Sequence, residues 1–188
     1  MSRRGAITSL PNIITLGRLL AVPLLVYFIL QEAYAAAFVV FVLAGLSDAV
    51  DGFIARAWNA HSIYGAYLDP LADKALLLAT YVSLGRTGAL ADWLVILVVF
   101  RDVLIVGGAA LFYMLSEGPS VRPIFISKVN TLMQILLAAL VLARLGLDFR
   151  VEWLTGGLVW VVAATTILSG GSYIVIGMRS ANRTEPRR

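Results

Sequence analysis

Long apolar runs dominate the chain and are separated by short polar or glycine-containing breaks. Six runs approach or exceed the roughly 20 residues that a helix needs to span a bilayer, and they cover residues 11–30, 34–57, 65–85, 92–114, 124–144 and 153–178. The breaks fall where polar and turn-forming residues cluster, at 31–32, 58–62, 85–88, 116–123 and 146–152. The pattern therefore predicts an all-α chain of six helices joined by short loops.

Composition turns this helical pattern into a prediction of a membrane protein. The 188 residues are 60% hydrophobic and 14% charged, with a mean hydropathy of +0.89, whereas soluble domains are about 45–50% apolar. We predict one polytopic membrane domain over 1–188, with 1–10 as a cytosolic N-terminal segment and 179–188 as a cytosolic tail. The first run continues to about Leu30 without a small-residue cleavage site, which indicates a retained helix. The absence of cysteine excludes disulfides and thiolate chemistry.

Lysine and arginine positions predict the orientation of these six spans. If both termini are cytosolic, the cytosolic side carries Arg3, Arg4, Arg56, Arg122, Lys128, Arg179, Arg183, Arg187 and Arg188. The opposite side carries Arg86, Arg144 and Arg150. The positive-inside rule thus favours cytosolic termini and a cytosolic loop at 58–62. The net charge of +4 then points to anionic lipid and not to nucleic acid.

Four carboxylates interrupt the apolar pattern. Asp48 and Asp51 are three residues apart at the end of the second run, and Asp69 and Asp73 are four apart at the start of the third. Each spacing places a pair on one helix face, and a tight loop predicts that the two helices are antiparallel neighbours. Four such charges near hydrocarbon need a counter-charge. Oxygen-only ligands suit Mg²⁺ or Mn²⁺, and two cations about 4 Å apart would clamp a phosphoryl displacement.

Small and basic residues lie between the acids. Gly52, Ala55 and Gly65 leave space for a planar base or a phosphate, and Arg56 can pair with a phosphate through its planar fork. Pro70 is acceptable in a helix that begins close by, where its missing N–H falls in the first turn. A structural alternative stays open, since acids at helix ends are often solvated and glycines in membrane helices serve packing.

The combined spacing D-x2-D-G-x2-A-R-x8-G-x3-D-x3-D resembles the signature of the CDP-alcohol phosphatidyltransferase family at all eight fixed positions. The resemblance extends over essentially the whole chain. It implies a CDP-linked lipid substrate, usually CDP-diacylglycerol, whose lipid-bearing phosphorus is attacked by an acceptor hydroxyl while CMP leaves. It also implies a two-metal site, with Mg²⁺ or Mn²⁺ held by Asp48, Asp51, Asp69 and Asp73.

The same resemblance implies further roles and partners. Asp73 would be the base that takes the acceptor's proton, and Gly52, Ala55, Arg56 and Gly65 would line the CDP pocket. Proteins of this family are usually homodimers. We therefore expect a homodimeric integral membrane protein of the bacterial inner membrane, or its mitochondrial equivalent, whose active site faces the cytosol.

Polar residues inside other apolar runs are candidate contacts to the lipid phosphate or the acceptor. Asn12, Thr15 and Arg18 recur at three-residue spacing on one face, where a snorkelling arginine is the structural alternative. Arg101 and Asp102 lie well inside the fourth run, where ionisable groups are functional or form structural pairs.

The fifth run carries two further polar pairs. Lys128 and Thr131 can share one face, and Asn130 and Gln134 another, with hydrogen bonding between helices as the structural alternative. The runs R-D-V-L-I and I-S-K-V-N-T-x-x-Q resemble the CMP-forming cardiolipin synthase branch. In the phosphatidylglycerophosphate synthase branch the first usually reads R-E and the second G-K-x-K-T, from which Asp102 and Asn130 depart.

The branch resemblance makes phosphatidylglycerol the expected acceptor and cardiolipin the product. Glycerol 3-phosphate is the alternative acceptor, since Arg101, Arg122 and Lys128 could neutralise its phosphate. Phospholipase D chemistry needs a repeated H-x-K motif and is excluded, because His61 is the single histidine and Ile63 stands two residues later. A small transporter is the competing class, although its polar residues would be expected around a midplane site.

Overall fold

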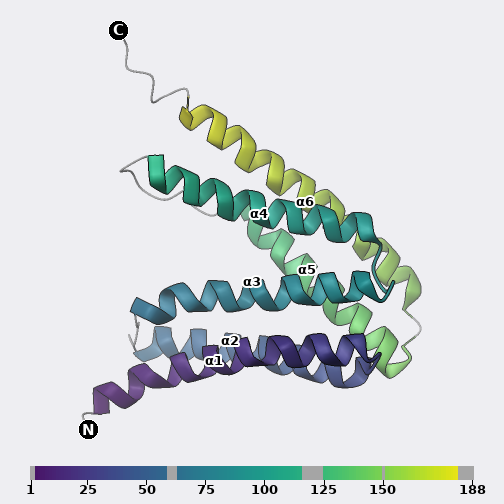
Figure 1. The fold of residues 1–188 in the computed structure, drawn as a ribbon, viewed down its shortest axis with the longest axis horizontal. Coiled ribbons are helices and arrows are strands. Elements are labelled where there is room, and N and C mark those ends of the chain that lie inside the picture. Colours follow the sequence, from purple (N-terminus) through teal and green to yellow (C-terminus); the bar gives the residue numbers. More distant parts are fainter. Residues whose placement is uncertain (1–2, 59–62, 116–124, 150, 182–188) are drawn as a thin grey trace. The chain divides into compact units, whose positions relative to one another are not determined.

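The computed structural model describes residues 3–58, 63–115, 125–149 and 151–181, with side chains described for 15–48, 72–108, 125–149 and 151–176. Six helices occupy these ranges (Figure 1): α1 Arg3–Leu30, α2 Tyr34–Trp58, α3 Ile63–Arg86, α4 Asp92–Leu115, α5 Phe125–Leu147 and α6 Glu152–Ala181. No strand occurs within the described ranges. The prediction of an all-α chain with six helices is confirmed.

Every helix extends beyond its predicted limits at one end or both, and α1 does so the furthest. The first begins at Arg3, so most of the segment predicted as a polar end is helical, and α6 continues to Ala181. Apolar runs locate the part of a helix that suits lipid. Helix formation itself continues through polar residues such as arginine and serine, which the helical backbone accommodates at small cost.

The expectation that Pro70 lies in a first helical turn was wrong. Helix α3 begins at Ile63, seven residues before this proline. A proline there removes the hydrogen bond that the residue's N–H would make to the carbonyl of Ala66. Losing one such bond costs less than ending the helix, which would leave several backbone groups without partners.

The end of α3 shows how the predicted breaks form. Gly88 adopts a φ of 73°, in the left-handed region that favours glycine. Its N–H donates to the carbonyl of Gly85 at 2.9 Å, and the N–H of Ala89 donates to that of Leu84 at 2.9 Å. These two bonds close a Schellman motif. The break predicted at 85–88 therefore terminates the helix through glycine geometry.

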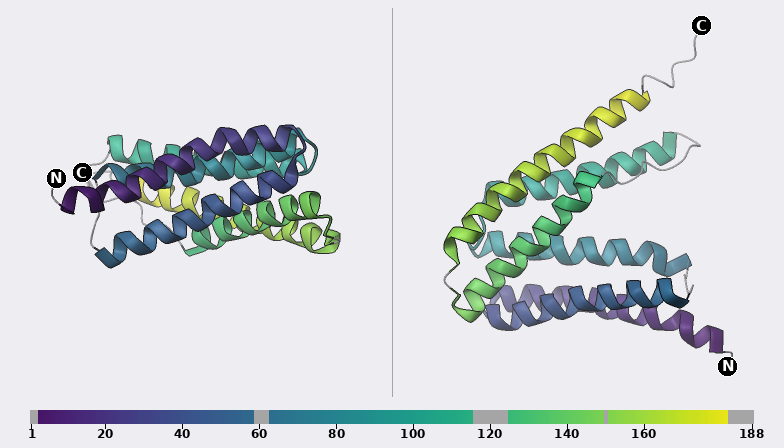
Figure 2. Two further views of the ribbon diagram at one scale, coloured as in Figure 1. Left: turned by 90° about the horizontal axis from the view of Figure 1, so that it is seen from below. Right: turned by 180° about the vertical axis from the view of Figure 1, so that it is seen from behind.

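The first compact unit comprises Met1–Leu90 together with Ala138–Val151. In this unit α1 packs against both α2 and α3 (Figures 1 and 2). The largest fully buried side chains of α1 and α3 are Leu25, Ile29, Tyr81 and Leu84. Helix α1 is consequently the helix from which a side chain can reach either of the other two.

The second compact unit comprises Ala91–Leu137 together with Glu152–Arg188. Here α4 packs against α6, and the rings of Trp93 and Trp160 lie 5.6 Å apart between their centroids. Helix α5 contributes to both units, because the division falls after Leu137. The prediction of a single domain over the chain stays a prediction.

Helix length and composition bear on the membrane prediction. Within the described residues, Phe125–Leu147 and Glu152–Ile176 are long and apolar enough to cross a bilayer. Thr15–Leu30 and Tyr34–Asp48 form shorter apolar stretches. The presence of six membrane spans stays a prediction.

Candidate functional site

A buried arginine joins the two acid-bearing helices of the first unit. The side chain of Arg18, on α1, is 0% exposed. Its Nη1 atom lies 2.9 Å from Oδ1 of Asp48 on α2 and 2.6 Å from Oδ1 of Asp73 on α3. The two carboxylates are 43% and 45% exposed. One guanidinium nitrogen thus donates to acids from two different helices. The two carboxylates are themselves open to an incoming ligand.

The local sequence explains how Arg18 reaches this position. Helix α1 contacts both α2 and α3, and Thr15 and Arg18, three residues apart, lie on the same helical face. Both are buried, so the predicted shared face is confirmed for these two residues. The side chain of Asn12 lies outside the described residues.

The predicted convergence of acids from the second and third helices is confirmed for Asp48 and Asp73. Their Oδ1 atoms contact the same nitrogen, so they are no farther apart than the sum of those two contact distances. The remaining members of the predicted site lie on α2 and α3, but their side chains fall outside the described residues: Asp51, Gly52, Ala55, Arg56, Gly65 and Asp69.

The donor set fits a hard divalent cation. Asp48 and Asp73 present carboxylate oxygens, half-exposed and held close together. Mg²⁺ binds such oxygens at about 2.0–2.1 Å, so two oxygens that share one cation can be separated by up to about 4 Å. That separation lies within the limit set by their common contact. Among side chains that the structure describes, no group of three or more acids or histidines gathers.

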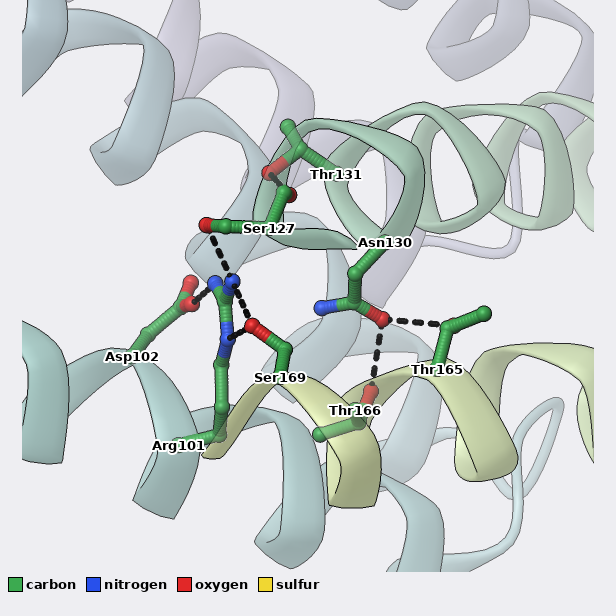
Figure 3. A network of polar contacts seen from close by, with 8 residues as sticks. All are labelled: Arg101, Asp102, Ser127, Asn130, Thr131, Thr165, Thr166 and Ser169. Atoms are coloured by element: carbon green, nitrogen blue, oxygen red, sulfur yellow. Dashed lines mark hydrogen bonds and ion pairs between the residues drawn. The ribbon is translucent and has the colours of Figure 1, made fainter. Parts of the chain in front are cut away.

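The second unit contains a separate polar network around Arg101 (Figure 3). Arg101 is buried on α4, and its Nη1 donates to Oδ1 of Asp102 at 2.6 Å. Nη2 donates to Ser127 of α5 at 2.5 Å and to Ser169 of α6 at 2.7 Å, and Nε also faces Ser169 at 3.2 Å. The guanidinium therefore links three helices and is neutralised by a neighbour in sequence.

A second part of this network lies one turn further along α5. Asn130 is fully buried, and its Oδ1 accepts hydrogen bonds from Thr165 at 2.8 Å and Thr166 at 2.9 Å, both on α6. Gln134, one turn beyond Asn130, is fully buried as well. The predicted common face of Asn130 and Gln134 is confirmed, and for Asn130 it serves bonding between helices.

Comparison with known proteins identifies the family. The sequence model of the CDP-alcohol phosphatidyltransferase family matches residues 8–168 of this chain. The chain belongs to this family. The match spans Arg18, the whole acid-rich signature and most of the Arg101 network, and membership favours the enzyme interpretation over a transporter.

Members of two branches are similar to this family member. It is 38% identical over 189 residues to CDP-diacylglycerol--glycerol-3-phosphate 3-phosphatidyltransferase 1, chloroplastic, of Oryza sativa subsp. japonica, with 90% of the chain covered. It is 36% identical to a cardiolipin synthase (CMP-forming)/mitochondrial hydrolase fusion protein of Schizosaccharomyces pombe and 35% identical to cardiolipin synthase (CMP-forming) of Rattus norvegicus, each match covering 92% of the chain. The chain spans 57%, 31% and 62% of the lengths of these three proteins.

Among the acceptor-contact candidates of this family member, Lys128 is exposed and Arg101 is buried. The hydroxyl of Thr131 bonds its own helix, at the carbonyl of Ser127. The Arg101–Asp102 contact fits the structural pair that the sequence left open, and a contact of either basic residue with an acceptor stays a prediction. Arg122 and His61 lie outside the described residues.

Sequence reasoning missed the network partners Ser127, Thr165, Thr166 and Ser169. The run T-T-x-x-S in α6 places hydroxyls one turn apart in an otherwise apolar helix, which was the available signal. That signal is weak because serine and threonine commonly bond their own helix, as Thr165 also does toward the carbonyl of Val161 at 2.9 Å.

Proposed function

We propose that this protein transfers a phosphatidyl group from CDP-diacylglycerol to an acceptor hydroxyl and releases CMP. The observation that carries the proposal is the cluster of Asp48, Arg18 and Asp73, in which two of the four signature acids come together from two helices that both pack against α1. Family membership supplies the reaction class. The half-exposed carboxylates meet the need of such a reaction for acidic groups that a substrate can approach.

Asp73 is the proposed base. Its carboxylate would accept the proton of the acceptor hydroxyl, whose oxygen then forms a bond to the phosphorus that bears the lipid. The bond from that phosphorus to the oxygen of CMP breaks, and CMP leaves with the electron pair. General base catalysis requires the carboxylate within hydrogen-bond reach of the hydroxyl, and the 45% exposure of Asp73 leaves room for one.

Asp48, Asp51, Asp69 and Asp73 would together hold two divalent cations, Mg²⁺ or Mn²⁺. Oxygen ligands of this kind match the preference of both ions. When bound, such cations neutralise the negative charge of a diphosphate and of a departing phosphate. Gly52, Ala55, Arg56 and Gly65, which follow the first acids in the signature, would form the seat of the cytidine nucleotide.

The exposed faces of the helices support a location within the bilayer. On α4, Ile96, Phe100 and Val103 are 66%, 63% and 62% exposed and follow one another at helical spacing. On α6, Trp160 and Ile167 are likewise exposed. Apolar stripes of this kind suit contact with lipid tails. We propose an integral membrane protein with six spans, with both termini and the acid cluster facing the cytosol, as the basic residues predict.

Phosphatidylglycerol is the proposed acceptor and cardiolipin the product. The runs around Arg101 and Asn130 resemble the cardiolipin synthase branch, and two of the relatives carry that name. Glycerol 3-phosphate is the second candidate, because the relative from rice is named for it. Both acceptors offer a primary hydroxyl to the same base, so the reaction class is the same for both.

A product assay tests the acceptor. The purified full chain in nanodiscs receives labelled CDP-diacylglycerol and Mg²⁺ or Mn²⁺, with phosphatidylglycerol in one reaction and glycerol 3-phosphate in another. We expect labelled cardiolipin from the first reaction, identified by mass spectrometry. If phosphatidylglycerophosphate forms in the second reaction and no cardiolipin forms in the first, the acceptor is glycerol 3-phosphate and not phosphatidylglycerol.

A further inference from the structure

The charge balance around Arg18 shows a feature that the proposed reaction does not use. A single nitrogen of this fully buried guanidinium contacts two carboxylates that are both proposed metal ligands. A buried cation is strongly unfavourable without an anion beside it. Asp48 and Asp73 therefore stabilise the charge of Arg18, and they in turn are held together by that charge.

The same two oxygens cannot serve Arg18 and a divalent cation equally well. A cation ligated by Asp48 and Asp73 would lie next to the positive charge of Arg18. At a few ångströms, two like charges repel each other appreciably even at the effective dielectric constant near a protein surface. Each carboxylate has enough lone pairs to contact both cations, so it is this repulsion, and not a shortage of acceptor sites, that weakens the arginine contacts when a cation binds.

We propose that Arg18 is an exchangeable counter-ion of the acid cluster. Without a divalent cation it holds the acids of α2 and α3 together, and on cation binding it gives up its contact with them. This inference rests on the proposed function, which assigns the carboxylates to the cation. A phosphate group of the CDP-linked substrate then offers Arg18 an anion with the charge and the oxygen geometry that a guanidinium binds. Arg18 is thus a positioning residue that passes from carboxylate to phosphate.

Direct measurement of Mn²⁺ binding tests the exchange without relying on turnover. Free Mn²⁺ is followed by electron paramagnetic resonance during titration of the full chain in nanodiscs that lack CDP-diacylglycerol. Arg18→Gln removes the competing charge and should tighten Mn²⁺ binding at least about fivefold. Arg144→Gln removes one positive charge from another helix, α5, of the same unit and should leave the affinity unchanged. Arg18→Lys keeps the charge but loses the planar fork, and should tighten binding about twofold.

The same titration with CDP-diacylglycerol in the nanodiscs tests the second half of the exchange. In the wild type Arg18 would now bind the phosphate of the substrate. The difference in Mn²⁺ affinity between the wild type and Arg18→Gln should therefore shrink to less than about twofold. A difference that remains about fivefold would mean that Arg18 stays on the carboxylates.

The outcomes separate this inference from the function on which it rests. Equal or weaker Mn²⁺ binding by Arg18→Gln, with normal binding by the wild type, overturns the exchange alone. Absence of Mn²⁺ binding by the wild type overturns the proposed metal site and the exchange together. If Arg18→Gln does not fold, Arg18→Lys decides: an affinity equal to or weaker than that of the wild type overturns the exchange.

Discussion

Single side chains determine which chemistry the acid cluster can support. Asp73 forms one of the ion pairs of Arg18 and yet remains nearly half exposed. It can therefore contact a substrate hydroxyl without a rearrangement of its helix. Asp48 has the same partner and a similar exposure, so geometry alone does not tell the two acids apart. The role of base is assigned to Asp73 by the family signature, and a substitution can test it.

Replacing Asp73 by asparagine should abolish turnover while CDP-lipid binding stays detectable. The amide keeps the size of the side chain but cannot accept the acceptor's proton, and loss of a general base lowers rates by about 10²- to 10⁴-fold. CMP release measures the rate, and retention of radiolabelled CDP-diacylglycerol measures binding. Asp92→Asn, at an exposed acid in the first turn of α4, is the matched control. Near-normal turnover of Asp73→Asn would remove Asp73 from the role of base.

The buried pair of Arg101 and Asp102 should respond in the manner of a structural contact. Asp102→Asn leaves a buried guanidinium without its carboxylate, which costs about 3–5 kcal/mol when a buried pair is broken. The double change Arg101→Met with Asp102→Asn removes both charges and should be less destabilising than Asp102→Asn alone. Unfolding free energies from detergent titrations give both values. If the double variant instead loses at least the sum of the two single losses, the contact is not a coupled pair.

Side-chain positions could be predicted from the sequence only in part. The three-residue spacing of Thr15 and Arg18 predicted their common face, and Asp48 and Asp73 were predicted to converge. The contact of Arg18 with both acids was not predicted, because spacing along one helix contains no information about its neighbours. Nor were Ser127 and Ser169 identified as partners of Arg101, since their hydroxyls resemble those of any apolar helix.

At the scale of helices, the close approach of α5 to α2 in the first unit depends on one glycine. A Cβ atom added to Gly146 would lie 2.4 Å from the backbone nitrogen of Ala35 and 2.6 Å from its Cα. Backbone atoms cannot move aside as the end of a flexible side chain can. The absence of a side chain at Gly146 is therefore a condition for this packing.

Gly146→Ala should lower stability by about 1–3 kcal/mol, the usual cost of overpacking. Gly45→Ala provides the control, because nothing lies within 4 Å of the Cβ position at that glycine of α2. There alanine should be neutral or stabilising by up to about 1 kcal/mol, from its higher helix propensity. Thermal unfolding followed by circular dichroism compares the two. Equal stability of both variants would contradict the packing of α5 against α2.

Helix existence was easier to predict than helix limits. Apolar runs located all six helices, and glycine or polar clusters located the breaks, as Gly88 illustrates with its left-handed conformation. The beginning of α1 at Arg3 was not predicted, because hydropathy marks the part that suits lipid and not the start of hydrogen bonding. Pro70 was misplaced for a related reason, since the cost of one lost bond depends on surroundings that the local sequence does not state.

For the whole molecule, two compact units share α5, and each contains a polar cluster of its own. The unit with α1, α2 and α3 carries the acids, and the unit with α4 and α6 carries the Arg101 network. The family signature lies within the first unit. We therefore assign the proposed chemistry to the first unit, while contact of Arg101 or Lys128 with the acceptor stays a prediction.

Release of CMP from CDP-diacylglycerol tests the central proposal most directly. The purified full chain is incubated with CDP-diacylglycerol and phosphatidylglycerol, with and without Mg²⁺ or Mn²⁺, and CMP is quantified by chromatography. We predict cation-dependent release of CMP in equal amount to the new phospholipid. Failure to release CMP with any acceptor hydroxyl and either cation would contradict phosphatidyl transfer by this protein.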